Sequence, residues 1–135
     1  MPRLYREAPV NSIWEGSGNI MCLDVLRAIS REEAAVPAFL AELDAARGAN
    51  AALDTAADAL KDDLTHPKDL EVRARNITEL MAIALQGALL VRHAPAAVAD
   101  AFCVSRLGSP WTGAYGALPV GVDFDAIIDR VVPAS

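Results

Sequence analysis

The stretch KDLEVRARNITELMAIALQGALLVRH, residues 68–93, decides the fold of this chain. Its middle carries apolar side chains on nearly every side of a helix, which is typical of a helix enclosed by others. Pro67, Asp69 and Glu71 suit the first turn, where N–H groups lack partners and negative charge is favoured. The stretch therefore predicts one long central helix over about 68–93, with Leu85 in the core.

Helical periodicity extends on both sides of this stretch. The other expected helices span about 19–30, 35–47, 50–64, 95–107 and 123–130. Asn50 and Asp123 are the expected N-caps, because short polar side chains accept hydrogen bonds from the first free N–H groups. Aromatic residues make up only 5% of the chain, which favours helix over strand. The predicted fold is an all-α, up-down helical bundle in a single domain, residues 1–135.

Both ends of the chain differ from this pattern. The stretch GSPWTGAYGALPVG, residues 108–121, holds four glycines and two prolines, which interrupt regular structure. We therefore expect an irregular tail over 109–122 that wraps the bundle. Residues 1–12 contain Pro2 and Pro9 and are expected to form an irregular or short helical lead-in.

Charge and composition weigh against several classes of protein. The chain has 12 basic and 18 acidic residues, and residues 32–66 alone hold two bases against eight acids. Binding to nucleic acid needs clustered lysines and arginines, so it is disfavoured for this chain alone. The longest apolar stretch, 80–91, is too short to span a bilayer. We therefore expect a soluble cytoplasmic protein. The cysteines and histidines match no metal-ligand spacing, so we expect no metal site.

A second stretch, NSIWEGSGNI at residues 11–20, places one carboxylate in a glycine-rich loop. Glu15 follows Trp14, and a carboxylate beside an indole loses hydration, which raises its pKa toward that of a general base. The flanking glycines let backbone N–H groups come close to a ligand. Ser17 and Asn19 add polar side chains at the start of the next helix. Such a loop suits a carbonyl substrate or a phosphate-bearing cofactor.

The same residues also fit a purely structural interpretation, which spacing alone favours. Ser17 or Asn19 would cap the helix, Glu15 would favour the helix dipole, and Trp14 would belong to the core. The residue pattern by itself leaves both interpretations open.

The motif also resembles a known family. Arg6-Glu7-Ala8 followed by Ile13–Ile20 is similar to the C-terminal signature of acyl-CoA dehydrogenases. In that family an Arg-Asp-Ala segment precedes a Tyr-Glu-Gly-Thr-x-Gln-Ile loop at the same spacing. Trp for Tyr and Ser for Thr resemble the alkylation-response branch, as do RHAPAAVADAFCVSRLG (92–108) and WTGAYGALP (111–119). The resemblance spans essentially the whole chain.

The resemblance implies a role for each residue of the loop. Glu15 would be the base that removes the α-proton of an acyl-CoA thioester while a hydride leaves the β-carbon for the flavin. The backbone N–H of Glu15 would help to polarise the thioester carbonyl. The positions that match contacts to FAD are Trp14, Gly16, Ser17 and Asn19.

In this family an N-terminal helical domain and a middle β-domain hold most of the FAD. The chain resembles the C-terminal domain alone, with the active-site loop in residues 1–20, so we expect a fragment that is inactive by itself. A truncated gene, an internal start or proteolysis would each produce it. A homo-oligomer is also expected, because large apolar patches rarely stay uncovered. The alternatives are a helical oligomerisation module and a DNA-contacting domain, which the acidic charge disfavours.

Overall fold

The computed structural model describes residues 2–14, 16, 18–66, 68–108, 118 and 120–130. Its elements are α1 (Pro2–Glu7), the 3-10 helix η1 (Ala8–Ser12), α2 (Gly18–Arg31), α3 (Ala35–Asp44), α4 (Ala51–Thr65), α5 (Leu70–His93), α6 (Ala96–Arg106) and α7 (Phe124–Asp129). Every regular element in the described ranges is helical, which confirms the all-α prediction.

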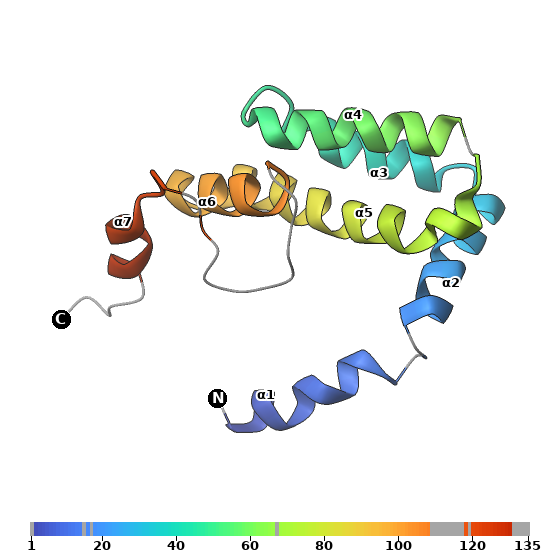
Figure 1. Ribbon diagram of the computed structural model, residues 1–135, viewed down its shortest axis with the longest axis horizontal. Coiled ribbons are helices and arrows are strands. Elements are labelled where there is room, and N and C mark those ends of the chain that lie inside the picture. The colour runs from blue at the N-terminus through green and yellow to red at the C-terminus, as the bar shows by residue number, and fades with distance from the viewer. Residues whose placement is uncertain are drawn as a thin grey trace.

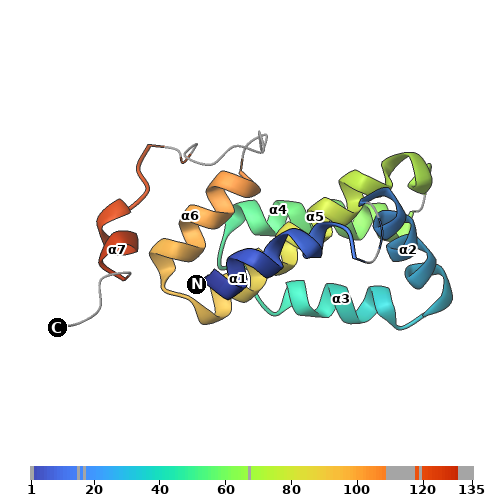
Figure 2. The ribbon, with the colours of Figure 1, turned by 90° about the horizontal axis from the view of Figure 1, so that it is seen from below.

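Helix α5 is the axis of the bundle. It contacts α2, α3, α4 and α6, and Figures 1 and 2 show α3 and α4 lying along it. Successive helices from α3 to α6 run in alternating directions, as expected for an up-down bundle (Figure 1). Although α5 has 24 residues, no helix in the described part of the chain is long and apolar enough to cross a membrane.

The core forms where α3, α4, α5 and α6 meet. Its buried members are Leu43, Ala46, Leu53, Ala57, Leu60, Ala84, Ala88 and Cys103. Burial raises the pKa of the Cys103 thiol, so this side chain packs as a small neutral group. A Cβ atom on Gly87 would lie 3.4 Å from the Leu53 Cδ1 and Cys103 Sγ atoms. The absence of a side chain on Gly87 therefore allows α4 and α6 to approach α5 closely.

The start of α5 differs from the sequence prediction. The helix begins at Leu70, and Asp69 occupies the N-cap position in the left-handed conformation, with φ 52° and no side-chain capping bond. Asp69 is therefore not in the first turn as predicted, and Pro67 lies outside the described residues. Among the other bounds, the largest difference is the end of α3, at Asp44 rather than 47.

Leu85 was expected in the core, but the structure leaves it only half-buried. The face of α5 that meets α4 and α6 carries Ala84, Gly87 and Ala88 instead. Successive helical residues point about 100° apart, so the residue after Ala84 turns away from this contact.

The two predicted N-caps are confirmed. The Asn50 side chain accepts hydrogen bonds from the N–H groups of Ala52 (3.1 Å) and Leu53 (3.3 Å) at the start of α4. The Asp123 carboxylate accepts one from the N–H of Ala126 (3.0 Å) at the start of α7. Both side chains satisfy donors that the first helical turn leaves unbonded.

The acidic helices α3 and α4 present their charges to solvent, because no polar or charged residue in the described ranges is buried. Two ion pairs tie these helices to α5. Arg92 Nη1 lies 2.9 Å from Glu42 Oε2, and Arg73 Nη2 lies 2.7 Å from Asp63 Oδ2. The Arg92–Glu42 pair is exposed, and such pairs contribute only about 0.2–1 kcal/mol. The Arg73–Asp63 pair is partly buried, because the Asp63 side chain is 18% exposed.

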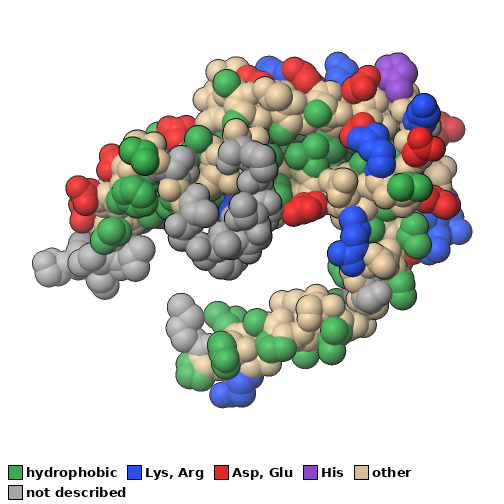
Figure 3. Space-filling model, in the orientation of Figure 1, with side chains coloured by type: hydrophobic (Ala, Val, Ile, Leu, Met, Phe, Trp, Pro, Cys, Tyr) green, Lys and Arg blue, Asp and Glu red, His purple; other side chains and the backbone are tan. Residues whose placement is uncertain are grey.

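Residues 2–14, which we call the N-terminal arm, stand apart from the bundle (Figures 1 and 3). The arm comprises α1, η1 and the turn after them, and none of its residues is buried. Its exposed apolar side chains are Leu4 (65% exposed), Tyr5 (82%), Val10 (50%), Ile13 (71%) and Trp14 (66%). The arm therefore adds no buried apolar surface to the core.

The Thr78 hydroxyl on α5 is buried and, among the described residues, has no hydrogen-bond partner. An unpaired buried hydroxyl costs about 1–3 kcal/mol. Thr78→Val keeps the branched shape and removes that hydroxyl, so we expect the free energy of unfolding in urea to rise by about 1 kcal/mol. Thr55 is the control, because its exposed Oγ1 donates to the Ala51 carbonyl (2.9 Å). A Thr78→Val variant no more stable than Thr55→Val would contradict this expectation.

Candidate functional site

Those of the predicted loop residues that the structure describes lie where the N-terminal arm meets α2. Trp14 ends the arm with its indole exposed, so the structural interpretation that placed Trp14 in the core is wrong. Glu15 and Ser17 lie outside the described residues. The structure thus places Trp14, Gly16 and Asn19 around the start of α2, while Glu15 and Ser17 stay predictions from the sequence.

Gly16 has a φ of +111°, a region that side-chain-bearing residues rarely adopt. A Cβ atom at this position would also lie 3.3 Å from Cγ2 of Ile20. The backbone N–H of Gly16 donates to the Ile13 carbonyl at 3.1 Å, which closes a turn at the end of the arm. The turn therefore requires glycine at position 16 and brings the chain directly into α2.

Asn19 lies inside the first turn of α2, which begins at Gly18, so it is not the helix cap that the structural interpretation considered. Its side-chain Oδ1 accepts a hydrogen bond from Arg75 Nε on α5 at 2.5 Å. Arg75 also approaches the helix start, because its Nη2 would lie 3.3 Å from a Cβ atom on Gly18. The glycine at position 18 leaves room for this guanidinium.

Arg75 is the residue at this site that the sequence did not indicate. It is separated from Asn19 by 56 residues, and an exposed arginine on a long helix is usually part of a solvated face. No local pattern links the two positions. Only the packing of α2 against α5 brings them together.

A hollow of about 480 Å³ lies beside this contact, between α2 and α5. Its lining residues are Gly18, Met21, Cys22, Arg75, Asn76, Thr78, Glu79 and Ala82. The hollow is open to solvent, and it combines amide, guanidinium, carboxylate, hydroxyl and apolar groups. This mixture is suited to an amphipathic organic ligand rather than to a metal ion.

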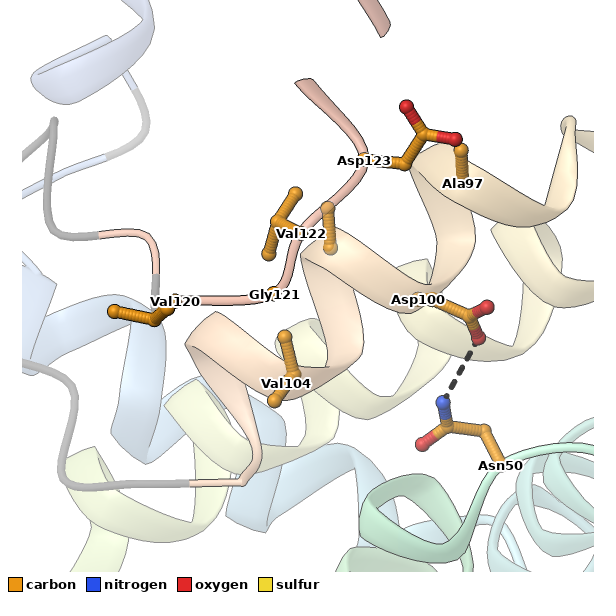
Figure 4. Close-up of a pocket in the computed structure, with 9 residues that line it drawn as sticks. Asn50, Ala97, Asp100, Val104, Val120, Gly121, Val122 and Asp123 are labelled. Atoms are coloured by element: carbon orange, nitrogen blue, oxygen red, sulfur yellow. Dashed lines mark hydrogen bonds between the residues drawn. The ribbon is translucent and has the colours of Figure 1, made fainter. Parts of the chain in front are cut away.

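A second hollow, of about 370 Å³, lies between α6 and residues 120–123 (Figure 4). Two carboxylates reach it, but both have structural partners. Asp100 Oδ1 accepts from Asn50 Nδ2 at 3.3 Å, and Asp123 caps α7. None of the described residues that line this hollow belongs to the N-terminal arm or to α2, so we do not place the candidate site there. In the described ranges, no group of three or more potential metal ligands is present either.

Comparison with known proteins decides the family. No family model matches the sequence. The chain is similar to the putative acyl-CoA dehydrogenase AidB of Escherichia coli. The two sequences are 40% identical over 103 residues, which cover 76% of this chain. It is also similar to acyl-CoA dehydrogenase family member 11 of Caenorhabditis elegans, with 31% identity over 113 residues, which cover 70% of this chain.

The chain belongs to the acyl-CoA dehydrogenase family. It matches only 19% of the length of the E. coli relative and 18% of the C. elegans relative. The family predicted from the loop motif is therefore confirmed. In this acyl-CoA dehydrogenase homologue, the roles of Glu15, Ser17 and the other loop residues remain predictions.

Proposed function

We propose that this chain is the C-terminal helical domain of a cytoplasmic, FAD-dependent acyl-CoA dehydrogenase. In the intact flavoprotein its loop would supply the base and cofactor contacts for α,β-dehydrogenation of an acyl-CoA thioester. The observation that carries the proposal is the exposed Trp14, in a motif of this family and 66% accessible. Folding of the bundle does not use this indole, so it is available to a ligand.

The residues present fit a flavin nucleotide in three respects. The left-handed Gly16 lets the backbone come close to a ligand, and the exposed Trp14 indole provides an aromatic face. The Asn19 amide keeps donor capacity beyond its bond to Arg75. FAD, when bound, would accept the hydride that leaves the β-carbon of the substrate.

The chain's own groups would then act on the substrate side. The Glu15 carboxylate would accept the α-proton, and its backbone N–H would donate a hydrogen bond to the thioester oxygen as negative charge develops there. The Trp14 indole would lie along the acyl chain and exclude water from the carboxylate. This exclusion raises the pKa of a carboxyl toward neutrality, which makes it a stronger base.

The isolated chain should bind FAD more weakly than about 10 µM and should not turn over acyl-CoA, because few contacts must offset the entropy lost on binding. Among the described residues, the N-terminal arm makes few contacts with the bundle helices, so these residues form no enclosed cofactor site around it. The arm stands apart from the bundle in Figure 3. Isothermal titration with FAD and the flavin absorbance after gel filtration test this expectation. A low-micromolar affinity, or flavin that survives gel filtration, would contradict it.

Self-association is a second candidate function, supported by the surface area. The chain exposes 9480 Å², whereas a compact monomer of its mass exposes about 6,800 Å². The difference of about 2,700 Å² belongs to one chain, and it exceeds the roughly 800 Å² that each partner buries in an interface of standard size. The exposed apolar side chains of the N-terminal arm contribute to it. Either the rest of the flavoprotein or another copy of the chain would cover this surface, and sedimentation of the isolated chain distinguishes the two.

Binding to DNA finds less support. On the face that Figure 3 shows, basic and acidic side chains alternate and form no basic stripe. The net charge of −6 also opposes the approach of phosphates.

A further inference from the structure

Arg75 makes a single contact that links the central helix to the candidate loop. Its Nε–H donates to Asn19 Oδ1 at 2.5 Å, and its Nη2 lies over Gly18. Among the described residues, Asn19 is the only hydrogen-bond or ion-pair partner of this guanidinium. The contact therefore joins Arg75 to one of the residues that we propose to contact FAD.

The chemistry of the two side chains fixes the orientation of the amide. A guanidinium has only donors, so the Asn19 atom that faces it must be the carbonyl oxygen. The NH₂ group of the same planar amide must then point away from the Nε of Arg75. Without Arg75, the oxygen and nitrogen could exchange places by a half-turn of the amide.

We propose that Arg75 is a positioning residue: it holds the Asn19 amide so that its NH₂ group faces the cofactor. The NH₂ group of Asn19 then acts toward FAD as a hydrogen-bond donor, and its partner must be an acceptor atom of the nucleotide. This inference rests on the proposed role of Asn19 as a cofactor contact. Arg75 itself acts through Asn19.

A purely structural role explains the contact less well. Both side chains are exposed, and the stability contributed by an exposed hydrogen bond is small because water competes for both groups. The helix α5 already has structural ties through Arg73, which pairs with Asp63, and Arg92, which pairs with Glu42. Gly18 adds to the argument, because a larger residue would crowd the guanidinium against the helix start.

Nuclear magnetic resonance of the ¹⁵N-labelled chain tests the geometry without any cofactor. In the unmodified chain, the two side-chain NH₂ protons of Asn19 should differ from those of Asn11, which is exposed in the arm. Arg75→Met should move the Asn19 signals toward those of Asn11, and Arg75→Lys should restore part of the difference. Arg31→Met, on the exposed end of α2, is the control and should leave them unchanged. Asn19 signals that do not respond to Arg75→Met would overturn the proposal.

Binding of FAD to the full-length flavoprotein tests whether the orientation of the Asn19 amide strengthens the binding of the cofactor. Arg75→Met should weaken FAD binding about 2- to 10-fold, the effect of losing one oriented hydrogen bond, with no change in melting temperature. Asn19→Asp keeps an acceptor for Arg75 but loses the outward donor, so it should weaken FAD binding at least as much. If only Asn19→Asp weakens binding, Arg75 does not position the amide, although the cofactor contact stands. If Asn19→Asp has no effect, the proposed cofactor contact itself fails.

Discussion

Glu15→Gln in the FAD-bearing full-length protein should slow acyl-CoA oxidation by about 100-fold or more, because general-base catalysis contributes at least that much. Glutamine keeps the shape and hydrogen-bonding reach of the carboxylate but cannot accept the α-proton. FAD should stay bound, since the amide can make the same contacts. Rapid mixing with an acyl-CoA under anaerobic conditions, followed by loss of the oxidised flavin absorbance, measures this step.

Two further variants separate the roles in the loop. Glu33→Gln removes an exposed carboxylate after α2 and should leave the rate unchanged. Ser17→Ala should weaken FAD binding rather than slow proton removal, because its proposed role is a cofactor contact. A Glu15→Gln protein that oxidised acyl-CoA normally but lost FAD would show that the loop clamps the cofactor and that the base lies elsewhere.

Leu60→Ala should destabilise the bundle by about 3–5 kcal/mol, as expected for a large-to-small change at a rigid core site. Leu60 is 0% exposed and packs in the cluster formed by α3, α4, α5 and α6. The loss comprises the transfer free energy of the deleted methyl groups and the cavity that they leave. Urea denaturation followed by circular dichroism measures it.

Two positions on α5 serve as controls for the loss of stability expected of Leu60→Ala. Val72 is 89% exposed, so Val72→Ala should change the free energy of unfolding by less than about 0.5 kcal/mol. Leu85→Ala should fall between the two, because that side chain is half-buried. A Leu60→Ala variant as stable as Val72→Ala would show that the core is not formed as described.

The helices were predictable because their signals are local. Apolar spacing and the polar caps at Asn50 and Asp123 depend on residues within one or two turns, and the structure confirms both. The orientation of α5 was not predictable from its own sequence, since apolar residues surround it on most sides. Which of them become core depends on where α4 and α6 pack, and this contact selects Ala84 and Ala88 rather than Leu85.

At the candidate site, too, the local features were predictable from the sequence and those that depend on packing were not. The loop motif could be read directly, because its residues are contiguous and match a family signature. The exposure of Trp14 could not, since a tryptophan beside an apolar helix usually indicates core. Arg75 could not be found either, because its link to Asn19 crosses 56 residues and arises only from the packing of two helices.

The separation of the N-terminal arm from the bundle has a consequence for how the protein tolerates change. No residue of 2–14 is buried, so substitutions there do not disturb the packing that keeps the chain folded. Selection for abundance would therefore act mainly on the bundle, whereas selection for the proposed activity would act on the arm and the loop that follows it. A protein with a damaging substitution at Trp14 would stay folded. Its level in the cell would therefore not fall, because the degradation machinery removes unstable variants.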